Sequence, residues 1–267
     1  MFVVTSGVLV ISHGSRDQGW IDKIEQAVSD ARLAIPVETV FLELVPGKTI
    51  EDGIRRLESQ GLTQILAVPL FLTMGSTHLA EIQYALGLIP ASPIPTDLCI
   101  IQSKAEIIWC APLESHPYVQ AILSERVKNL SQDPLQEGLL LIGHGSEIQG
   151  FHERWEALLT SLTESLQKQW AFSEIAYATF HPDNIQERAE KLAKKSRLIV
   201  LPFFLSEGYF TNLAIPSRLK GLEYRYRGEG LLPHPYISVW LADMVRLYLP
   251  QEKRIDDTQR LLYTLNQ

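Results

Sequence analysis

The chain lacks the features that mark several large classes of protein. It has 2 cysteines in 267 residues, too few for a disulfide framework, a Cys-x-x-Cys motif or an iron–sulfur cluster held within one chain. We expect Cys99 and Cys110 both to be buried, inert thiols. No apolar stretch approaches the ~18 residues that cross a membrane, and residues 1–11 lack the basic region and cleavage site of a signal peptide. These absences predict a cytoplasmic protein with no membrane partner.

Basic residues are also in the minority. Lys and Arg number 24 against 31 Asp and Glu, a formal net charge of −7. Because nucleic-acid binders concentrate Lys and Arg, often among aromatic residues, this composition predicts no nucleic-acid partner. The hydrophobic share of 46% and charged share of 21% are those of a globular protein long enough for two domains.

What the sequence does contain is a phrase written twice. Val8–Ser15 (VLVISHGS) is matched by Leu139–Ser146 (LLLIGHGS), and residues 8–28 aligned with 139–159 share 8 identities in 21 positions. Two more pairs follow in the same order: Gln64–Leu72 with Arg197–Leu205, and His116–Tyr118 with His234–Tyr236. Three matched pairs in one order indicate two homologous halves, about 1–133 and 134–267.

Buried-strand runs alternate with helical periodicity in both halves. In the first half, strands are predicted near 7–12, 37–42, 65–72 and 98–102, and helices near 20–31, 50–60 and 119–130. In the second half, strands are predicted near 139–142, 175–179 and 198–204, and helices near 152–170 and 185–195, with 222–232 unassigned. This alternation predicts an α/β fold in which each half is a parallel sheet with helices on both faces.

Three chemically active side chains follow successive strands of the first half. His13 follows the first strand, Glu43 the second, and His78 lies in the loop after the third. Because parallel strands end at one edge of a sheet, these groups are expected to converge there. Two imidazoles and a carboxylate suit Fe²⁺, Co²⁺ or Ni²⁺. They equally suit proton transfer, since the ordinary pKa of histidine is ~6.5.

Other catalytic motifs fail on spacing. Ser12 stands where a dinucleotide-binding motif needs its first glycine, no P-loop pattern is present, and neither Ser15 nor Ser146 has the flanking glycines of a nucleophile elbow. These two serines are expected to cap the helices that follow or to bind an acidic group there.

Four segments of the first half resemble the CbiX-type sirohydrochlorin chelatases, which insert Co²⁺ or Fe²⁺ into sirohydrochlorin without ATP. They are Ser12–Asp17 (SHGSRD), Phe41–Leu44 (FLEL), Val68–Leu72 (VPLFL) and, after Gly75, His78–Ile82 (HLAEI). The resemblance implies a chelatase-like fold of two flavodoxin-like lobes around a tetrapyrrole cleft.

The resemblance also implies roles for individual residues. His13, His78 and Glu43 would be the metal ligands and catalytic bases, so the lobe 1–133 would do the chemistry and 134–267 would close the cleft. The second half keeps His144 but has Thr211 in place of His78. His181 lies near the position of Glu43 and is expected to be structural or a minor metal contact.

The substrates implied are sirohydrochlorin and a divalent metal ion, with no permanently bound cofactor. The groups expected to bind sirohydrochlorin, whose carboxylates favour cations and helix N-termini, are Ser15, Arg16, Lys48, His144 and Ser146. The protein is expected to be a monomer with internal pseudo-twofold symmetry. The residues favour neither Co²⁺ nor Fe²⁺. Two alternatives stay open: a chelatase for another metal or tetrapyrrole, and a non-catalytic metallochaperone or tetrapyrrole carrier.

Overall fold

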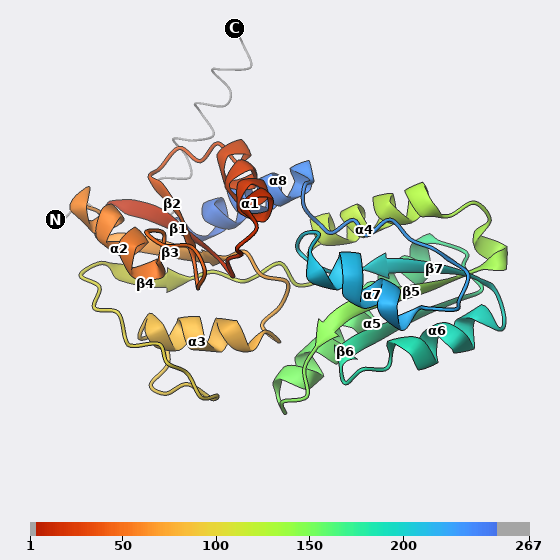
Figure 1. Ribbon diagram of the computed structural model, residues 1–267. Coiled ribbons are helices and arrows are strands. Elements are labelled where there is room, and N and C mark those ends of the chain that lie inside the picture. The colour runs from red at the N-terminus through yellow and green to blue at the C-terminus, as the bar shows by residue number, and fades with distance from the viewer. Residues whose placement is uncertain (1–3, 250–267) are drawn as a thin grey trace, which may run out of the picture. The chain divides into compact units, whose positions relative to one another are not determined.

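Two parallel four-stranded sheets organise the computed structural model, which describes residues 4–249 (Figure 1). The first sheet has the order β2-β1-β3-β4, with β1 Ser6–Ser12, β2 Val37–Phe41, β3 Gln64–Pro69 and β4 Glu106–Trp109. The second has the order β6-β5-β7-β8, with β5 Glu137–Gly145, β6 Glu174–His181, β7 Arg197–Pro202 and β8 Tyr224–Arg225. The predicted α/β class and the matching of the two halves are confirmed.

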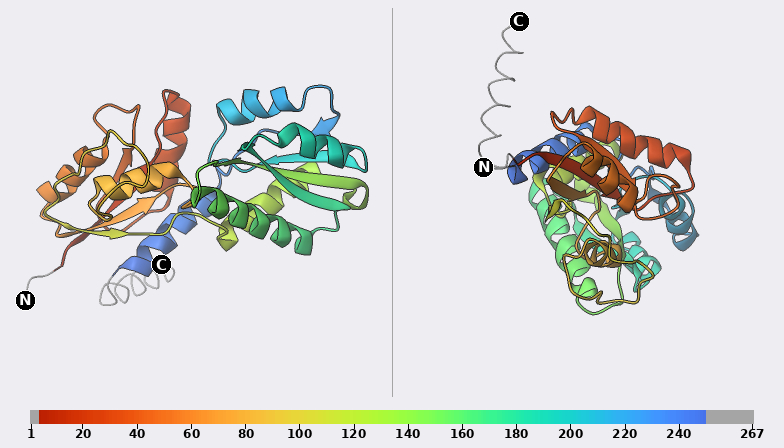
Figure 2. Two further views of the ribbon diagram at one scale, coloured as in Figure 1. Left: turned by 90° about the horizontal axis from the view of Figure 1, so that it is seen from below. Right: turned by 90° about the vertical axis from the view of Figure 1, so that its left-hand side faces the viewer.

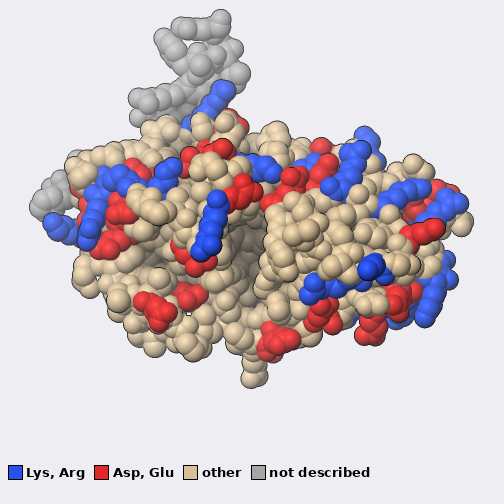
Figure 3. Space-filling view, viewed as in Figure 1, with Lys and Arg blue, Asp and Glu red and all other residues tan. Residues whose placement is uncertain are grey.

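The helices complete each parallel connection. Those of the first half are α1 Gln18–Asp30, α2 Ile50–Ser59, α3 Thr77–Ala85 and α4 Pro117–Leu130. Those of the second are η1 Pro134–Gln136, α5 Phe151–Gln169, α6 Ile185–Ala193, the π-helical η2 Phe210–Ala214, α7 Ile215–Arg218 and α8 Pro235–Tyr248. No helix between residues 4 and 249 is long and apolar enough to cross a membrane. On the face drawn in Figure 3, basic and acidic side chains are interspersed.

Two compact units contain the two sheets, but they are not contiguous in sequence. Among the described residues, the first unit joins 4–70 with Ala80–Pro112 and 238–249, and the second joins Phe71–Leu79 with Leu113–Ile237. Helix α4 belongs to the second unit because it packs on β7 and α5. The ranges 1–133 and 134–267 therefore each hold one sheet but do not coincide with the compact units.

The centre of the first sheet explains its continuous apolar runs. β1 lies between β2 and β3, and Val8 to Ile11 are fully buried. Helix α1 covers one face of this sheet and α3 the other (Figures 1 and 2). A strand covered on both faces places every side chain in the core, so it reads as an unbroken apolar run.

The second sheet repeats this arrangement. Leu140 and Ile142 of β5 join a buried cluster with Ile185 and Leu192 of α6. The intervening position Gly143 faces Leu159 of α5 instead. Successive residues of a strand point to opposite faces, so α5 and α6 cover opposite faces of this sheet (Figure 2).

One predicted strand is wrong. Residues 98–102 have no regular structure, and the fourth strand of the first sheet begins later, at Glu106. Glu58 of α2 fixes this register, because its carboxylate accepts hydrogen bonds from the Ser103 hydroxyl and from the backbone N–H groups of Lys104 and Ala105. Burial raises the pKa of a carboxylic acid, but these hydrogen bonds outweigh it and hold the pKa of Glu58 below its ordinary value.

One cysteine is buried beside β4 and the other is exposed in the irregular segment before it. Cys110 lies directly after β4 and is buried, as expected, and burial raises the pKa of its thiol to about 12. Cys99 lies in the irregular segment before the strand and is exposed. The expectation of two buried thiols is therefore wrong for Cys99.

The third repeated phrase begins a helix in each half. The Nδ1 atom of His116 accepts the backbone N–H of Tyr118 at the start of α4, and Nδ1 of His234 accepts that of Tyr236 at the start of α8. The rings of Tyr118 and Tyr236 stack with centroids 5.4 Å apart. These histidines cap helices, so this phrase is structural, and the two helices begin side by side.

A buried carboxylate anchors the start of the second sheet. Glu137, the first residue of β5, is fully buried and accepts hydrogen bonds from the Ser131 hydroxyl, the Gln132 N–H and, at 2.6 Å, the Arg225 guanidinium. Burial alone raises the pKa of such a group. The hydrogen bonds and Arg225 outweigh burial, so the pKa of Glu137 lies below its usual 4.5.

We expect Glu137→Gln to lower the free energy of unfolding at pH 7 by about 1.5–3 kcal/mol, the value of hydrogen bonds to a buried charged group. Because the pKa is lower in the folded state, this contribution is present above pH 4.5 and declines as pH falls below it. Urea denaturation of both proteins at pH 7 and at acid pH measures the difference. The control Glu174→Gln removes a more exposed pair with Lys195 and should cost less than ~1 kcal/mol. Equal losses for the two variants would contradict the assignment.

Candidate functional site

His13 stands directly after β1, at the edge of the first sheet where its strands end. Its Nδ1 atom lies 3.1 Å from the carbonyl oxygen of Gly14. A carbonyl only accepts hydrogen bonds, so Nδ1 carries the proton and Nε2 carries the lone pair. That Nε2 atom lies 3.6 Å from Oε1 of Glu43. The structure thus brings together two of the three side chains predicted to form the site.

Glu43 is positioned by the turn that follows β2. Its backbone N–H donates to the carbonyl oxygen of His13, and the preceding Leu42 donates to that of Ser12. Gly14 has a φ of +103°, and a Cβ atom there would lie 1.9 Å from the Glu43 carbonyl oxygen. Only glycine permits this approach, so the contact of the His13 and Glu43 segments depends on Gly14.

His78 lies in the first turn of α3, one residue after the helix begins, and not in a loop as predicted. It is half-buried. The preceding turn is held within the second compact unit, where Glu114 accepts the N–H of Met74 at 2.7 Å and Arg154 donates to the Met74 carbonyl. Among residues 4–249, no group of three or more His, Cys, Asp or Glu side chains that could hold a metal ion is formed. The participation of His78 therefore stays a prediction.

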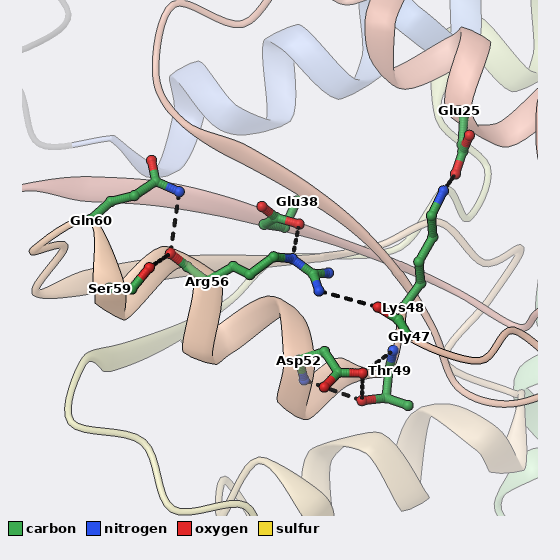
Figure 4. A network of polar contacts seen from close by, with 9 residues as sticks. All are labelled: Glu25, Glu38, Gly47, Lys48, Thr49, Asp52, Arg56, Ser59 and Gln60. Carbon is green, nitrogen blue, oxygen red and sulfur yellow. Dashed lines mark hydrogen bonds and ion pairs between the residues drawn. The ribbon is translucent and has the colours of Figure 1, made fainter.

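The cations predicted to bind substrate differ in their environment. Arg16 is exposed in the loop between β1 and α1. Lys48 forms an ion pair with Glu25 of α1, as Figure 4 shows. The same figure shows how the loop around Lys48 is fixed, since Arg56 bonds to Glu38 and to the carbonyl of Gly47. The negative charge of Glu25 therefore competes with any other carboxylate that approaches Lys48.

The two repeated serines do not cap helices, so the first of their two predicted roles is wrong, and the binding of an acidic group stays a prediction. Helix α1 is capped by Asp17, whose carboxylate accepts the N–H of Gly19. The Ser15 hydroxyl accepts the N–H of Asp17 instead, and the Ser146 hydroxyl accepts that of Ile148. Each serine bonds the backbone two residues further on, because each helix begins later than the repeated phrase suggests. Both therefore fix the loops that leave the strand ends.

The second half rebuilds the same turn with different side chains. His144 places Nδ1 3.0 Å from the carbonyl of Gly145, as His13 does with Gly14. β5 and β6 pair Gly145 with His181, which gives His181 the position of Glu43. The rings of His144 and His181 have centroids 4.9 Å apart. The sequence placed His181 only near this position, and the strand register establishes it.

The position that corresponds to His78 carries no imidazole. Thr211 is buried, and its hydroxyl accepts the N–H of Gly208 at 2.9 Å, so it fixes the start of η2. The neighbouring Phe210 meets the His144 ring edge to face at 5.1 Å, and Trp155 of α5 lies 6.4 Å from it. Sequence reasoning missed Trp155, because the loop after β5 and the first turn of α5 separate it from His144. The only signal for Phe210 was its place beside Thr211.

The CbiX family model matches residues 7–130 and 138–245. The chain belongs to the CbiX family. It is similar to a sirohydrochlorin ferrochelatase of Priestia megaterium, 27% identical over 217 residues, which covers 77% of this chain and 75% of the relative. It is also similar to a sirohydrochlorin cobaltochelatase of Methanopyrus kandleri, 27% identical over 135 residues, which covers 45% of this chain and 94% of the relative.

The CbiX fold is shared with a solved structure of SirB from Bacillus subtilis with Fe³⁺. The TM-score is 0.71 at 20% identity, with 91% of this chain and 95% of that chain covered. The two segments matched by the CbiX model each contain one copy of the His-Gly-Ser phrase, at His13–Ser15 and His144–Ser146. Family membership thus extends over both halves.

Proposed function

We propose that this CbiX-family protein is a sirohydrochlorin chelatase, a lyase-class enzyme that inserts Co²⁺ or Fe²⁺ into sirohydrochlorin without ATP. The observation that carries the proposal is the pair formed by His13 and Glu43, whose Nε2 and Oε1 atoms lie 3.6 Å apart at the end of the first sheet. Similarity to proteins named as a ferrochelatase and a cobaltochelatase of sirohydrochlorin supports the substrate.

The pair has the chemistry that metal insertion requires. Two protons leave the pyrrole nitrogens of the macrocycle when a divalent metal enters, so the site must supply acceptors. The hydrogen bond from Nδ1 to Gly14 fixes the His13 tautomer that presents a lone pair on Nε2. Glu43 supplies a second acceptor and an oxygen ligand for the incoming ion. The metal is a substrate in this scheme, and no permanently bound cofactor is needed.

The remaining residues complete the proposal. His78 would act with His13 and Glu43 as a ligand or base. Arg16, Lys48 and the loops braced by Ser15 and Ser146 would bind the carboxylates of sirohydrochlorin, and His144 would contact the macrocycle. We also propose that the enzyme is a cytoplasmic monomer.

Absorbance spectroscopy of sirohydrochlorin tests the activity directly. With purified protein at a small fraction of the substrate concentration, Co²⁺ or Fe²⁺ under anaerobic conditions, and no ATP, we expect the product to form faster than in the protein-free reaction. Because an enzyme turns over, the product should exceed the protein by many equivalents.

Two other outcomes would count against the proposal. Rates equal to the protein-free reaction with both metals would exclude a sirohydrochlorin chelatase for cobalt or iron. A spectral change that stops at one equivalent of protein would identify a carrier that binds its ligand without turnover. Repeating the assay with Ni²⁺ measures whether the site discriminates among divalent metals, all of which bind imidazole but with different affinities.

A further inference from the structure

The second half contains a pair of histidines to which we have assigned neither proton transfer nor metal binding. His144, the penultimate residue of β5, and His181, the last residue of β6, lie on adjacent strands with ring centroids 4.9 Å apart and planes inclined by 43°. The pair occupies the place that His13 and Glu43 occupy in the first half, with an imidazole in place of the carboxylate.

Hydrogen bonding prepares His144 to act as a ligand. Its Nδ1 atom lies 3.0 Å from the Gly145 carbonyl oxygen, which in the neutral ring places the proton on Nδ1 and the lone pair on Nε2. Histidines that bind metals commonly donate their other N–H to a carbonyl, because this fixes the tautomer and the ring orientation.

The separation of the rings matches that of two imidazoles on one metal ion. With a metal–nitrogen bond of about 2.0–2.1 Å, a ring centroid lies about 3.2 Å from the ion, so two rings at octahedral to tetrahedral angles lie about 4.5–5.2 Å apart. The observed 4.9 Å falls within that interval. The centroid separation of the pair is thus compatible with two imidazoles that bind one ion.

The surroundings give this pair one apolar side and one open side. Phe210 packs edge to face on His144 at 5.1 Å and Trp155 lies 6.4 Å away, so apolar rings hold the His144 imidazole in place. His181 is exposed, which leaves room for water to complete the coordination of an ion. Imidazole with water is a donor set for Co²⁺, Ni²⁺, Cu²⁺ and Zn²⁺.

We propose that His144 and His181 together bind a divalent transition-metal ion, in addition to the ion proposed for His13 and Glu43. Its two imidazole ligands come from neighbouring strands of the second sheet, and water supplies the others. The site requires neither sirohydrochlorin nor metal insertion, so it stands independently of the proposed chelatase activity.

Calorimetric titration with Co²⁺ tests the site in the full chain without a polyhistidine tag. His13→Ala and His78→Ala together remove the imidazoles proposed for the metal site of the first half and serve as the background. This background should still bind one equivalent of Co²⁺, and adding His181→Ala should weaken binding at least ~10-fold, because one of two protein ligands is lost. His181 is exposed, so its removal leaves the core intact. His144→Ala in the same background should have a similar effect.

A histidine outside the pair provides the matched control. His152 lies in the same half, with Nδ1 2.9 Å from the Ser146 carbonyl, and His152→Ala should leave Co²⁺ affinity within twofold of the background. Electron paramagnetic resonance of bound Cu²⁺ should show coupling to two imidazole nitrogens, falling to one in His181→Ala. A background that binds no Co²⁺, or a His181→Ala variant with unchanged affinity, would overturn the proposal. Chelatase activity enters neither measurement, so the two proposals fail separately.

Discussion

Replacing His13 by alanine is expected to lower kcat/KM for metal insertion into sirohydrochlorin by at least ~10²-fold, the lower end of what a positioned acid–base group contributes. The substitution removes the Nε2 lone pair that faces Glu43 at 3.6 Å. It leaves a half-buried strand end whose backbone contacts do not depend on the imidazole. His78→Ala is expected to have an effect of the same order. Initial rates with Co²⁺ measure both, after circular dichroism has shown that each variant is folded.

The matched control is the equivalent histidine of the second half. His144 makes the same hydrogen bond to the following glycine, but its neighbours are His181 and Phe210, and Thr211 replaces the third group. His144→Ala should therefore cost much less and should act mainly on KM. Equal losses in kcat/KM for folded His144→Ala and His78→Ala would place chemistry in both halves.

The carboxyl ends of the strands could be located from the sequence, because each strand is a short segment whose end lies near its last apolar residue. β1 is an unbroken buried run and β2 is a shorter strand that ends in two buried apolar residues, so the residue after Ser12 and the residues after Phe41 are identifiable without coordinates. Parallel register then requires the two strand ends to meet, and His13 and Glu43 do meet. The same counting put His181 near the position of Glu43.

Local periodicity in the sequence does not reveal which elements pack against one another. The apolar face of α4 shows that the helix is covered but not which sheet covers it, and α4 packs on β7 and α5 of the second unit. Similarly, the apolar residues 98–102 satisfy a strand pattern, yet the hydrogen bonds of Glu58 fix the following residues and the strand begins at Glu106. In both places a contact between residues distant in sequence decides the outcome, which local periodicity does not reveal.

Side-chain pairing was likewise invisible before the structure. Lys48 reads as an available cation, but it pairs with Glu25, which lies 23 residues earlier on α1. Ser15 reads as a helix cap, but Asp17 caps α1 and Ser15 bonds to the backbone of Asp17. In each case the residue type was compatible with the predicted role, and the outcome depended on which side chain of α1 or of its N-cap lies nearby.

Both halves keep a glycine after the strand-end histidine for the same steric reason. Gly14 and Gly145 have φ values of +103° and +77°, and a Cβ on either would lie 1.9 or 2.3 Å from the carbonyl oxygen of Glu43 or His181. The glycine thus lets the backbone after one strand touch the backbone after the next. That contact sets the distance between the two functional side chains, whichever pair a half carries.

This contact predicts that adding one methyl group at Gly14 strongly destabilises the fold. We expect Gly14→Ala to lower the free energy of unfolding by at least about 3 kcal/mol, because the Cβ needs both a φ that alanine avoids and a displacement of the Glu43 backbone. Gly47, in the same unit, separates the two effects, since its φ is +76° but no atom lies within 4 Å of a Cβ built there.

Gly47→Ala should therefore cost only the conformational term, about 1–2 kcal/mol. Urea denaturation of both variants beside the unsubstituted protein gives the two free energies, and their difference isolates the contact with Glu43. If Gly14→Ala folds, the displaced Glu43 should also lower metal insertion, whereas Gly47→Ala should leave it within about twofold, well short of the loss expected when an acid–base group is displaced. Equal destabilisation by the two substitutions would mean that the turn after β2 yields without strain, and that the spacing of His13 and Glu43 is not set by this glycine.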